Sequence, residues 1–304
     1  MVEGTGAERT AAFDAGERAA WAGRSTAYAA SFGRLCAHTV PELLAACGPL
    51  AGRRLLDVGT GTGAVAARAR EHGAQVSAVD ADPGMARAAA RAVPEARTAV
   101  AALPRLPFAP DAFDAVVANF VLNHVGRPRA ALAELVRVAR PGGRIAFTLW
   151  PVPAAPGQAL LGRAVEAAGV RRPADLPTLD PAEDFPRTEQ GVRALLTEAG
   201  LDAAQCRTLA WEHRTGPAEW WSGPAAGVAT IGRVVASRPA AEQAEIHRHF
   251  LKLSDPFTAP DGALLLPHTA LLARAIVPPR SGGPDRTGPD AVRAAGQVPG
   301  GASR

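Results

Sequence analysis

Residues 55–63, which read LLDVGTGTG, constrain the fold of this chain more than any other stretch. The mostly apolar run from Arg53 to Val58 predicts a short buried strand. The alternating glycines then permit a tight turn where side chains would clash, so that a ligand can touch the backbone. Residues 64–72 are small or favour helices, and the first amide groups of such a helix point back toward the turn. Together these features predict the nucleotide-binding end of a doubly wound α/β domain.

The glycine turn does not by itself choose the ligand. Gly59, Gly61 and Ala64 also satisfy the dinucleotide pattern G-x-G-x-x-G/A, and a glycine-rich turn without any ligand is a further interpretation. A second strand is predicted over residues 75–79, and Asp80 closes it where a carboxylate at a strand tip can meet a ribose.

The neighbouring acid has a different expected role. Asp82 precedes Pro83 and is the natural N-cap of a helix that runs to about Val93. Asp80 is then available to bind a ligand.

The rest of the first half alternates between strands and helices. Further strands are expected over residues 96–100, 112–118 and 144–150, with a helix over 128–140 and a Pro-Gly-Gly turn at 141–143. This alternation predicts a parallel sheet with helices on both faces.

Composition shifts after residue 150, where the chain becomes dense in proline. Helices are expected near residues 158–168 and over 189–199, a sixth strand over 204–214, two or three helices over 217–253 and a last strand over 268–277. The helices between the last two strands form an insertion over the cleft. We therefore expect an N-terminal helical lid at 1–47, a nucleotide-binding core at 48–150, completion of the sheet with a helical substrate cap at 151–277, and a disordered tail at 278–304.

Charge and cysteine usage exclude several functions. The net charge is only +4, and the 33 basic residues, of which one is lysine, are scattered, so no nucleic-acid partner is expected. Cys36, Cys47 and Cys206 lie far apart without CxxC spacing, which predicts reduced, buried thiols and no metal site. The N-terminus has no apolar signal core, and no run approaches the roughly 18 apolar residues of a membrane span. A soluble cytoplasmic protein with no membrane partner is expected, and its oligomeric state is left open.

Five motifs follow one another in the first half of the chain. They are Asp57-x-Gly59-x-Gly61-x-Gly63, Asp80 at a strand tip, Leu106-Pro107-Phe108, Phe113-Asp114-Ala115-Val116-Val117 and Arg140-Pro141-Gly142-Gly143-Arg144. The set resembles the class I S-adenosylmethionine-dependent methyltransferases, in particular the small-molecule type that includes the ubiquinone and menaquinone biosynthesis enzymes (methyltransferase type 11). The resemblance implies a Rossmann-like, mostly parallel seven-stranded sheet with a helical cap, and makes residues 48–150 the S-adenosylmethionine-binding core. Dinucleotide dehydrogenases share the glycine turn but are not expected to show the later motifs.

The resemblance implies roles for residues of the glycine turn. Asp57 would hold the methionyl amino group of the cofactor, directly or through water. Gly59, Thr60 and Gly61 would bring the backbone close to the methionine and the ribose. Gly63 would allow close packing of the helix that follows.

A second group of residues is implied to hold the nucleoside. Asp80 would accept both ribose hydroxyls, while Ala81 and Met85 would flank the adenine, although a core role suits Met85 equally. Related sequences often place Asp at the position of Ala102, so the adenine would rely on backbone groups around Ala102 and Leu103.

Three residues are candidates for contact with the reacting groups. Asn119 follows the fourth strand, where family members touch the methionyl group or the acceptor, and a turn-forming role is the alternative. His124 is the candidate general base, with a structural hydrogen-bonding role as the alternative. Tyr28, the only tyrosine, either closes over the cofactor or packs in the core.

The predicted function is methyl transfer to O, C or N of a small acceptor. Aromatic residues of the insertion predict a pocket for an apolar or aromatic molecule of secondary metabolism, or alternatively a packed core: Trp211, Trp220, Trp221, Phe250 and Phe257. The alternative function is a methyltransferase-like protein that binds the cofactor without methyl transfer, either as a cyclase or pericyclase or as a regulatory protein.

Overall fold

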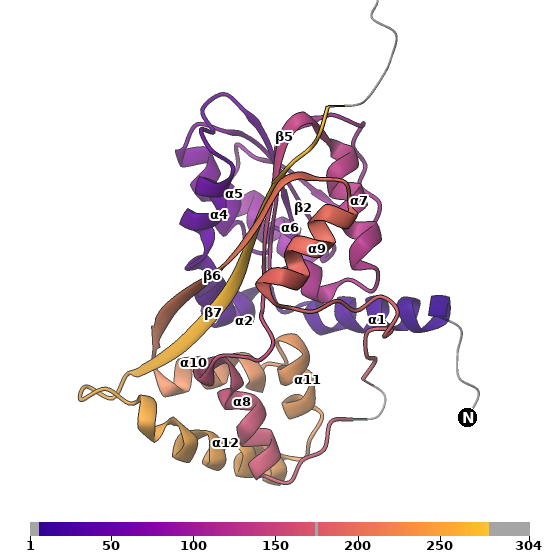
Figure 1. Cartoon of the computed structure of the whole chain (residues 1–304). Helices are drawn as coiled ribbons and strands as arrows, with labels where there is room; N and C mark the ends of the chain where they lie inside the picture. Colours follow the sequence, from indigo (N-terminus) through magenta and orange to yellow (C-terminus); the bar gives the residue numbers. More distant parts are fainter. Residues whose placement is uncertain (1–5, 174–175, 280–304) are drawn as a thin grey trace, which may run out of the picture.

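The structure of the chain is a computed structural model that describes residues 6–173 and 176–279. Within these residues a seven-stranded sheet carries helices on both faces, and a helical cap lies beyond one end of it (Figure 1). The Rossmann-like fold expected from the sequence is therefore confirmed. Of the expected disordered tail, residues 280–304 lie outside the described residues.

The elements follow the order expected from the sequence. The strands are β1 (Arg54–Val58), β2 (Gln75–Asp80), β3 (Arg97–Val100), β4 (Phe113–Asn119), β5 (Ala139–Leu149), β6 (Asp202–Thr215) and β7 (Leu264–Ile276). The helices up to β5 are α1 (Gly6–Trp21), α2 (Ser25–Ala30), α3 (Phe32–Ala37), α4 (Val40–Ala46), α5 (Ala64–Glu71), α6 (Pro83–Ala92), η1 (Leu122–His124) and α7 (Pro128–Val138). The later helices are α8 (Pro156–Ala167), α9 (Glu189–Glu198), α10 (Pro217–Ala225), α11 (Ala229–Ala236), α12 (Ala240–Ser254) and η2 (Asp255–Phe257).

The strand order of the sheet is β3-β2-β1-β4-β5-β7-β6. All pairs from β3 to β5 are parallel, and β7 runs antiparallel to both of its neighbours. The order reverses between β1 and β4, which pair so that Val58 lies opposite Ala118. Ligands of open α/β sheets bind beyond the carboxyl ends of the strands at such a reversal. The glycine turn after β1 and the loop after β4 both begin there.

Alternate side chains of the central strands fill two separate cores. Leu56 and Val58 of β1 belong to a cluster that includes residues of α7 and α9, whereas Leu55 belongs to a cluster with α4 and α5. On β4, Val116 and Val117 divide between the same two clusters. Because both faces are covered, the strands are apolar throughout instead of alternating with polar residues.

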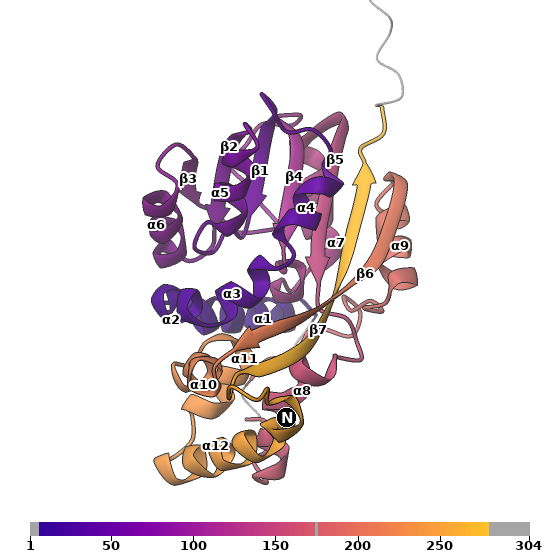
Figure 2. The same cartoon turned by 90° about the vertical axis from the view of Figure 1, so that its left-hand side faces the viewer.

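The last two strands extend well past the sheet. β5 pairs with β7 only from Leu271 to Ile276, but β6 pairs with β7 from Leu264 onward. The seventh strand was expected to begin at His268, so it starts earlier than predicted. The additional residues form a two-stranded ribbon that leads from the sheet to the cap (Figure 2).

The cap contains a helix that the sequence interpretation had not assigned to the insertion. Helix α8 precedes β6, yet its Leu160 and Leu161 share a core cluster with Trp220, Phe250 and Leu266. The cap therefore combines α8 with the helices between β6 and β7. Its apolar core holds these segments together although they are separated along the chain.

The expected Pro-Gly-Gly turn is an irregularity inside β5 and not its boundary. Phe113 pairs with Ala139 and Ala115 pairs with Arg144, so β5 advances five residues while β4 advances two. Gly142 takes the left-handed conformation, with φ of 71°, in the extra residues. The sequence predicted the turn at residues 141–143, but it did not predict that Ala139, before the turn, already pairs with β4.

Helix α1 lies between the sheet and the cap in both views (Figures 1 and 2). In the part of the chain that the structure describes, no helix is both long and apolar enough to cross a membrane.

Candidate active site

A cavity of about 670 Å³ lies where the strand ends, the N-terminal helices and the cap meet. The sequence-predicted residues that line it are Tyr28, Gly59, Gly61, Asp80, Ala81, Met85, Ala102, Leu103, Asn119 and His124. Asp57, Thr60 and Gly63 were also predicted as residues of the cofactor-binding turn, Gly63 through helix packing, but they do not line this cavity. The structure thus brings together residues from segments that are far apart along the chain.

The glycine turn shapes one wall of the cavity by having no side chains. Gly59 has φ of 67°, and a Cβ atom there would lie 2.4 Å from Cγ2 of Val121. Gly61 has φ of 56°, and its Cβ would lie 3.3 Å from the ring of Tyr28. Both the backbone conformation and the surrounding space therefore favour glycine. The open backbone is what the approach of a ligand requires.

Gly63 serves packing instead of lining the cavity. Its φ is 95°, and a Cβ atom would lie 3.2 Å from Cα of Ala89 in α6. The glycine thus lets α5 and α6 approach closely, which is the packing role expected for it.

Asp80 is held at the tip of β2 by backbone amides. The amide of Gly61 donates to Oδ2 at 2.8 Å, and the amide of Asp82 donates to Oδ1 at 2.9 Å. Burial raises the pKa of Asp80 to about 6, although these backbone hydrogen bonds act in the opposite direction. Because a carboxylate has about four acceptor positions, both oxygens can still accept a ligand hydroxyl.

The helix cap that was expected next to Asp80 is present. Oδ1 of Asp82 accepts a hydrogen bond of 2.8 Å from the amide of Met85, at the start of α6. Met85 itself is buried and also lines the cavity, so its two proposed roles are compatible.

Asp57 lies behind the glycine turn, with no exposed surface. The hydroxyl of Thr60 donates to its Oδ2 at 2.6 Å, and Oδ1 is buried without a hydrogen-bond partner among the described residues. Burial raises the pKa of Asp57 to about 7, against the effect of the Thr60 hydroxyl. Neither Asp57 nor Thr60 is among the residues that line the cavity. Their positions fit support of the turn better than direct contact with a ligand.

Asn119 connects the N-terminal helices to the sheet. Its Oδ1 accepts hydrogen bonds from the hydroxyls of Thr39, at 2.8 Å, and Thr148, at 2.6 Å. Its Nδ2 donates to the carbonyl of Cys36 at 3.0 Å. The side-chain amide of Asn119 thus makes three hydrogen bonds, to Cys36 in α3, to Thr39 just before α4 and to Thr148 in β5. Its role is therefore neither turn formation alone nor ligand contact alone.

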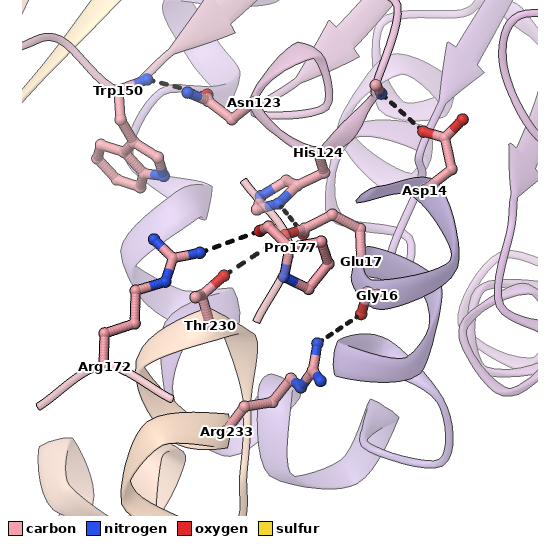
Figure 3. A network of polar contacts seen from close by, with 11 residues as sticks. Asp14, Gly16, Glu17, Asn123, His124, Trp150, Arg172, Pro177, Thr230 and Arg233 are labelled. Atoms are coloured by element: carbon pink, nitrogen blue, oxygen red, sulfur yellow. Dashed lines mark hydrogen bonds and ion pairs between the residues drawn. The ribbon is translucent and has the colours of Figure 1, made fainter. Parts of the chain in front are cut away.

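His124 and Glu17 form a paired acid and base at the cavity wall (Figure 3). Nδ1 of His124 lies 2.7 Å from Oε2 of Glu17, while Oε1 of Glu17 accepts from the hydroxyl of Thr230 at 3.5 Å. Burial acts to raise the pKa of Glu17, but His124, Thr230 and the nearby Arg233 outweigh it and hold the pKa below its ordinary value. Glu17 is therefore ionised at neutral pH and accepts the Nδ1 proton of His124. With Nδ1 engaged by the carboxylate, Nε2 is the ring nitrogen that is left for a ligand.

Tyr28 packs over the glycine turn and next to Trp21. Its ring meets that of Trp21 edge to face, with 5.7 Å between centroids, and Trp21 meets His124 in the same way at 5.1 Å. Burial raises the pKa of Tyr28 well above its ordinary value. Tyr28 is thus an uncharged phenol that closes one side of the cavity, and it is not a base at neutral pH.

Helix α1 contributes a set of residues that the sequence interpretation missed. Asp14, Glu17, Arg18 and Trp21 all line the cavity. Their spacing places them on one face of a helix, so a helical projection of residues 6–21 would have identified that face.

The aromatic residues of the insertion are mainly structural. Of the five expected at a pocket, Trp220 lines the cavity, while Phe250 is fully buried in the cap core and Trp221 stacks on Phe250. Trp150, at the end of β5, is a further aromatic residue of the lining. Trp150 reaches the cavity because of the direction that the chain takes after β5. No local sequence pattern predicts that direction.

The three cysteines are free thiols in the fold. Cys36 is partly buried, whereas Cys47 and Cys206 are buried, as the sequence predicted for them. Among the described residues, no group of His, Cys, Asp and Glu side chains is arranged to hold a metal ion.

The cavity suits a nucleoside that carries a small charged chain. It offers an exposed backbone at the glycine turn, a carboxylate for a diol at Asp80 and apolar surface from Met85 and Leu103. These groups match the parts of S-adenosylmethionine, and the remaining volume is bordered by the cap.

Comparison with known sequences supports the same assignment. The methyltransferase domain family matches residues 56–147. The demethylmenaquinone methyltransferase of Beutenbergia cavernae is 35% identical over 175 residues, which are 55% of this chain and 72% of that protein. That of Clavibacter sepedonicus is 40% identical over 114 residues, which cover 36% of this chain and only 46% of that protein.

Solved structures share the fold at low sequence identity. The YcgJ protein of Bacillus subtilis superposes with a TM-score of 0.52 at 22% identity, covering 80% of this chain and 99% of that one. A putative methyltransferase of Bacillus halodurans gives a TM-score of 0.52 at 17% identity, covering 80% and 100%.

These matches do not favour the alternative of a protein that binds the cofactor without transferring a methyl group. Five ordered motifs, the strand order of the sheet and the extended match to the Beutenbergia protein agree with one another. The chain therefore belongs to the class I S-adenosylmethionine-dependent methyltransferases of the small-molecule type.

Proposed function

We propose that this methyltransferase acts on a hydroxylated aromatic small molecule and that the Glu17–His124 pair removes the hydroxyl proton. The observation that carries this proposal is the cavity itself. Its wall includes the glycine turn and Asp80 as well as His124 and the rings of Trp21, Trp150 and Trp220. The Beutenbergia and Clavibacter relatives are named for demethylmenaquinone, a naphthoquinone whose two-electron-reduced quinol form is a hydroxylated aromatic.

In this proposal the cofactor binds to the part of the cavity wall that lies at the ends of the strands. Asp80 accepts the ribose hydroxyls, Met85 and Ala81 flank the adenine, and backbone groups of Ala102 and Leu103 contact its edge. The backbone at Gly59 and Gly61 lies along the methionine and ribose. Bound S-adenosylmethionine supplies a methyl group that the positive sulfur already activates.

Residues outside the cavity support this side of the site. Asp57 and Thr60 stabilise the glycine turn from behind, and Gly63 sets the position of α5 against α6. Asn119 keeps the lid in place by binding Thr39 and Thr148. In this view residues 1–47 act as the lid, 48–150 bind the cofactor, and 151–277 complete the sheet and cover the acceptor.

The chemical step needs alignment and the loss of one proton. Orientation of two reactants can supply roughly 7–11 kcal/mol of the barrier in favourable cases. Nε2 of His124 would accept the proton of the acceptor hydroxyl. The phenolate would then bond to the methyl group through its oxygen or the adjacent ring carbon as the methyl–sulfur bond breaks and S-adenosylhomocysteine leaves. Methylation at carbon would also require loss of the hydrogen on that carbon and return of a proton to the oxygen. Glu17 stabilises the protonated ring of His124 through Nδ1. Tyr28, which stays uncharged, closes the cavity against water.

The test is methyl transfer to 1,4-dihydroxynaphthalene, kept reduced, with S-adenosylmethionine carrying a labelled methyl group. The wild-type protein is expected to transfer the label. His124→Ala should lower kcat by roughly 10²- to 10⁴-fold, the usual contribution of a general base, with unchanged binding of S-adenosylhomocysteine by calorimetry. Glu17→Gln should lower kcat in the same direction, because the ring loses its ionised partner.

Two further variants separate binding from chemistry. Asp80→Ala should weaken binding of S-adenosylhomocysteine by at least about tenfold, since charge-assisted hydrogen bonds are lost. Glu219→Gln, which removes an ion pair with Arg34 outside the cavity, should change neither quantity. Full activity of His124→Ala on this acceptor would exclude the proposed base, and absence of label transfer by the wild type would exclude this acceptor class.

A further inference from the structure

The cap side of the cavity contains three buried polar atoms without a hydrogen-bond partner among the described residues. They are Oε1 of Gln158 in α8, Nε1 of Trp220 in α10 and Nε2 of His268 in β7. All three residues line the cavity. Buried polar groups are normally paired, so three orphaned atoms around one cavity indicate a ligand with matching polar groups.

The hydrogen positions of His268 follow from its partner. Nδ1 lies 2.9 Å from the carbonyl oxygen of Leu266. A carbonyl can only accept, so Nδ1 carries the hydrogen and Nε2 presents a lone pair. Burial also lowers the pKa of His268 to about 4, which keeps Nε2 unprotonated at neutral pH. The orphaned atom of His268 is therefore an acceptor that requires a donor.

The orphaned atom of Trp220 has the opposite requirement. An indole Nε1–H can only donate, and Trp220 is 3% exposed while His268 is 1% exposed. The two rings meet edge to face with 5.6 Å between their centroids, and both residues line the same cavity. A hydroxyl group both donates and accepts, whereas a carbonyl could satisfy Trp220 alone. Oε1 of Gln158 is an alternative acceptor, because a hydroxyl has one hydrogen and can donate to Gln158 or to His268 but not to both.

The rings around His268 hold it in this orientation. Trp211 stacks on it with an interplanar angle of 24°, and Trp150 lies 6.3 Å away between centroids. The ring of His213 also meets that of His268 edge to face, with 6.1 Å between centroids, yet among the described residues none donates a hydrogen bond to Nε2 of His268.

We propose that Gln158, Trp220 and His268 form a hydroxyl-binding subsite for the acceptor. The subsite binds a second hydroxyl of the aromatic acceptor, distinct from the one that His124 deprotonates, and so decides which position on the ring faces the methyl group. This inference rests on the proposed function, since it assigns the acceptor two oxygen substituents. Recognition of a hydroxyl by otherwise unpaired buried groups is a strong source of specificity.

The experiment compares two probes that differ by one hydroxyl group. Binding of 1,4-dihydroxynaphthalene and of 1-naphthol to the protein loaded with S-adenosylhomocysteine is measured by anaerobic calorimetry. The wild type is expected to bind the diol about tenfold more tightly, the effect of one well-placed hydrogen bond. In His268→Phe and Trp220→Phe the ratio should fall close to one, because each variant keeps an aromatic ring but loses one orphaned atom.

Two other variants complete the test. Trp221→Phe changes a neighbouring tryptophan that stacks on Phe250 and meets His247 at a tilt outside the cavity, and the ratio should stay near tenfold. Gln158→Leu, at a partly buried position near the start of α8, provides a second test of the subsite if His268→Phe does not fold. It should reduce the preference for the diol.

The outcomes distinguish this subsite from the proposed function. Equal binding of both probes by the wild type, or an unchanged ratio in His268→Phe and Trp220→Phe, would mean that water satisfies these atoms and would overturn the subsite. If the wild type prefers the diol but transfers no methyl group to it, the subsite stands and the proposed function fails. If neither probe binds while S-adenosylhomocysteine does, both are overturned.

Discussion

Two carboxyl groups lie beside the glycine turn, that of Asp57, which is fully buried, and that of Asp80, which is partly buried and lines the cavity. Burial raises their pKa values to about 7 and about 6, whereas an aspartate in an unfolded chain titrates near 4. The folded protein therefore binds these protons more tightly than the unfolded chain. By linkage, its stability falls as the pH rises from about 4 to about 7. The site thus carries buried charge at neutral pH at the expense of stability.

Asp57→Asn tests this balance at the residue scale. The amide oxygen can still accept from Thr60, while the cost of burying a charge is removed. We expect the cofactor-free variant to have a higher Tm than the wild type at pH 8, with a smaller difference at pH 5. Thermal unfolding at both pH values provides the measurement.

Asp114 is the matched control, because its pKa is shifted in the opposite direction. Partial burial acts to raise it, but the amide of Arg54 and the guanidinium of Arg140 hold it below its ordinary value. Its stabilising effect is present above pH 4 and is lost as the pH falls through the folded-state pKa. Asp114→Asn should therefore lower Tm at pH 8. An equal decrease in Asp57→Asn would show that the Asp57 carboxylate is stabilising.

At the scale of elements, the strand, glycine turn and helix formed by β1 and α5 could be predicted almost completely from the sequence. The apolar run, the glycines and the strand-tip acid are local signals, because each one determines the structure of only a few neighbouring residues. The Pro-Gly-Gly irregularity and the early start of β7 could not be predicted, because both depend on pairing with another strand. Extension of β7 is favoured by β6 and by the cap core, which lie elsewhere in the chain.

Gly63→Ala tests the contact between α5 and α6. A side chain there would be strained by the left-handed backbone and would also press on Ala89. Gly52 has a comparable φ of 72°, but a Cβ atom added there would meet nothing within 4 Å, so Gly52→Ala isolates the backbone strain. A non-glycine residue in this conformation costs about 1–3 kcal/mol.

We expect Gly63→Ala to destabilise the protein by at least about 1 kcal/mol more than Gly52→Ala, the difference reflecting overpacking. Urea unfolding of both variants gives the two free energies of unfolding. Equal losses would mean that α5 and α6 shift apart without cost.

At the scale of the whole molecule, α1 joins the segment after β4 to helix α11 of the cap. The amide of Gly126, after η1, donates to Asp14 at 2.6 Å, and Arg233 of α11 donates to the carbonyl of Gly16 at 3.0 Å. Glu17 contacts both sides through His124 and Thr230 (Figure 3). The geometry of the proposed base therefore depends on how the cap and the lid pack together.

Arg233→Ala should loosen this connection. Amide hydrogen exchange, followed by mass spectrometry, is expected to become faster in α1 and α11 and to stay unchanged in β1 and β4, because local openings of a fold are independent of its core. Arg238→Ala, which removes a cap hydrogen bond to the carbonyl of Arg171, is the control and should leave α1 unaffected. Unchanged exchange of α1 in Arg233→Ala would show that other contacts hold the helix.

The sequence by itself determined the succession of strands along the chain, the glycine turn and the strand-tip carboxylate, because each of these is written in short local patterns, and the resemblance of the ordered motifs to a known family implied the cofactor. Only the tertiary structure decided which side chains meet across the cavity. Glu17 and His124 are 107 positions apart, and Gln158, Trp220 and His268 come from three separate elements. No local pattern encodes such encounters, since they arise from the packing of the lid and the cap against the ends of the strands.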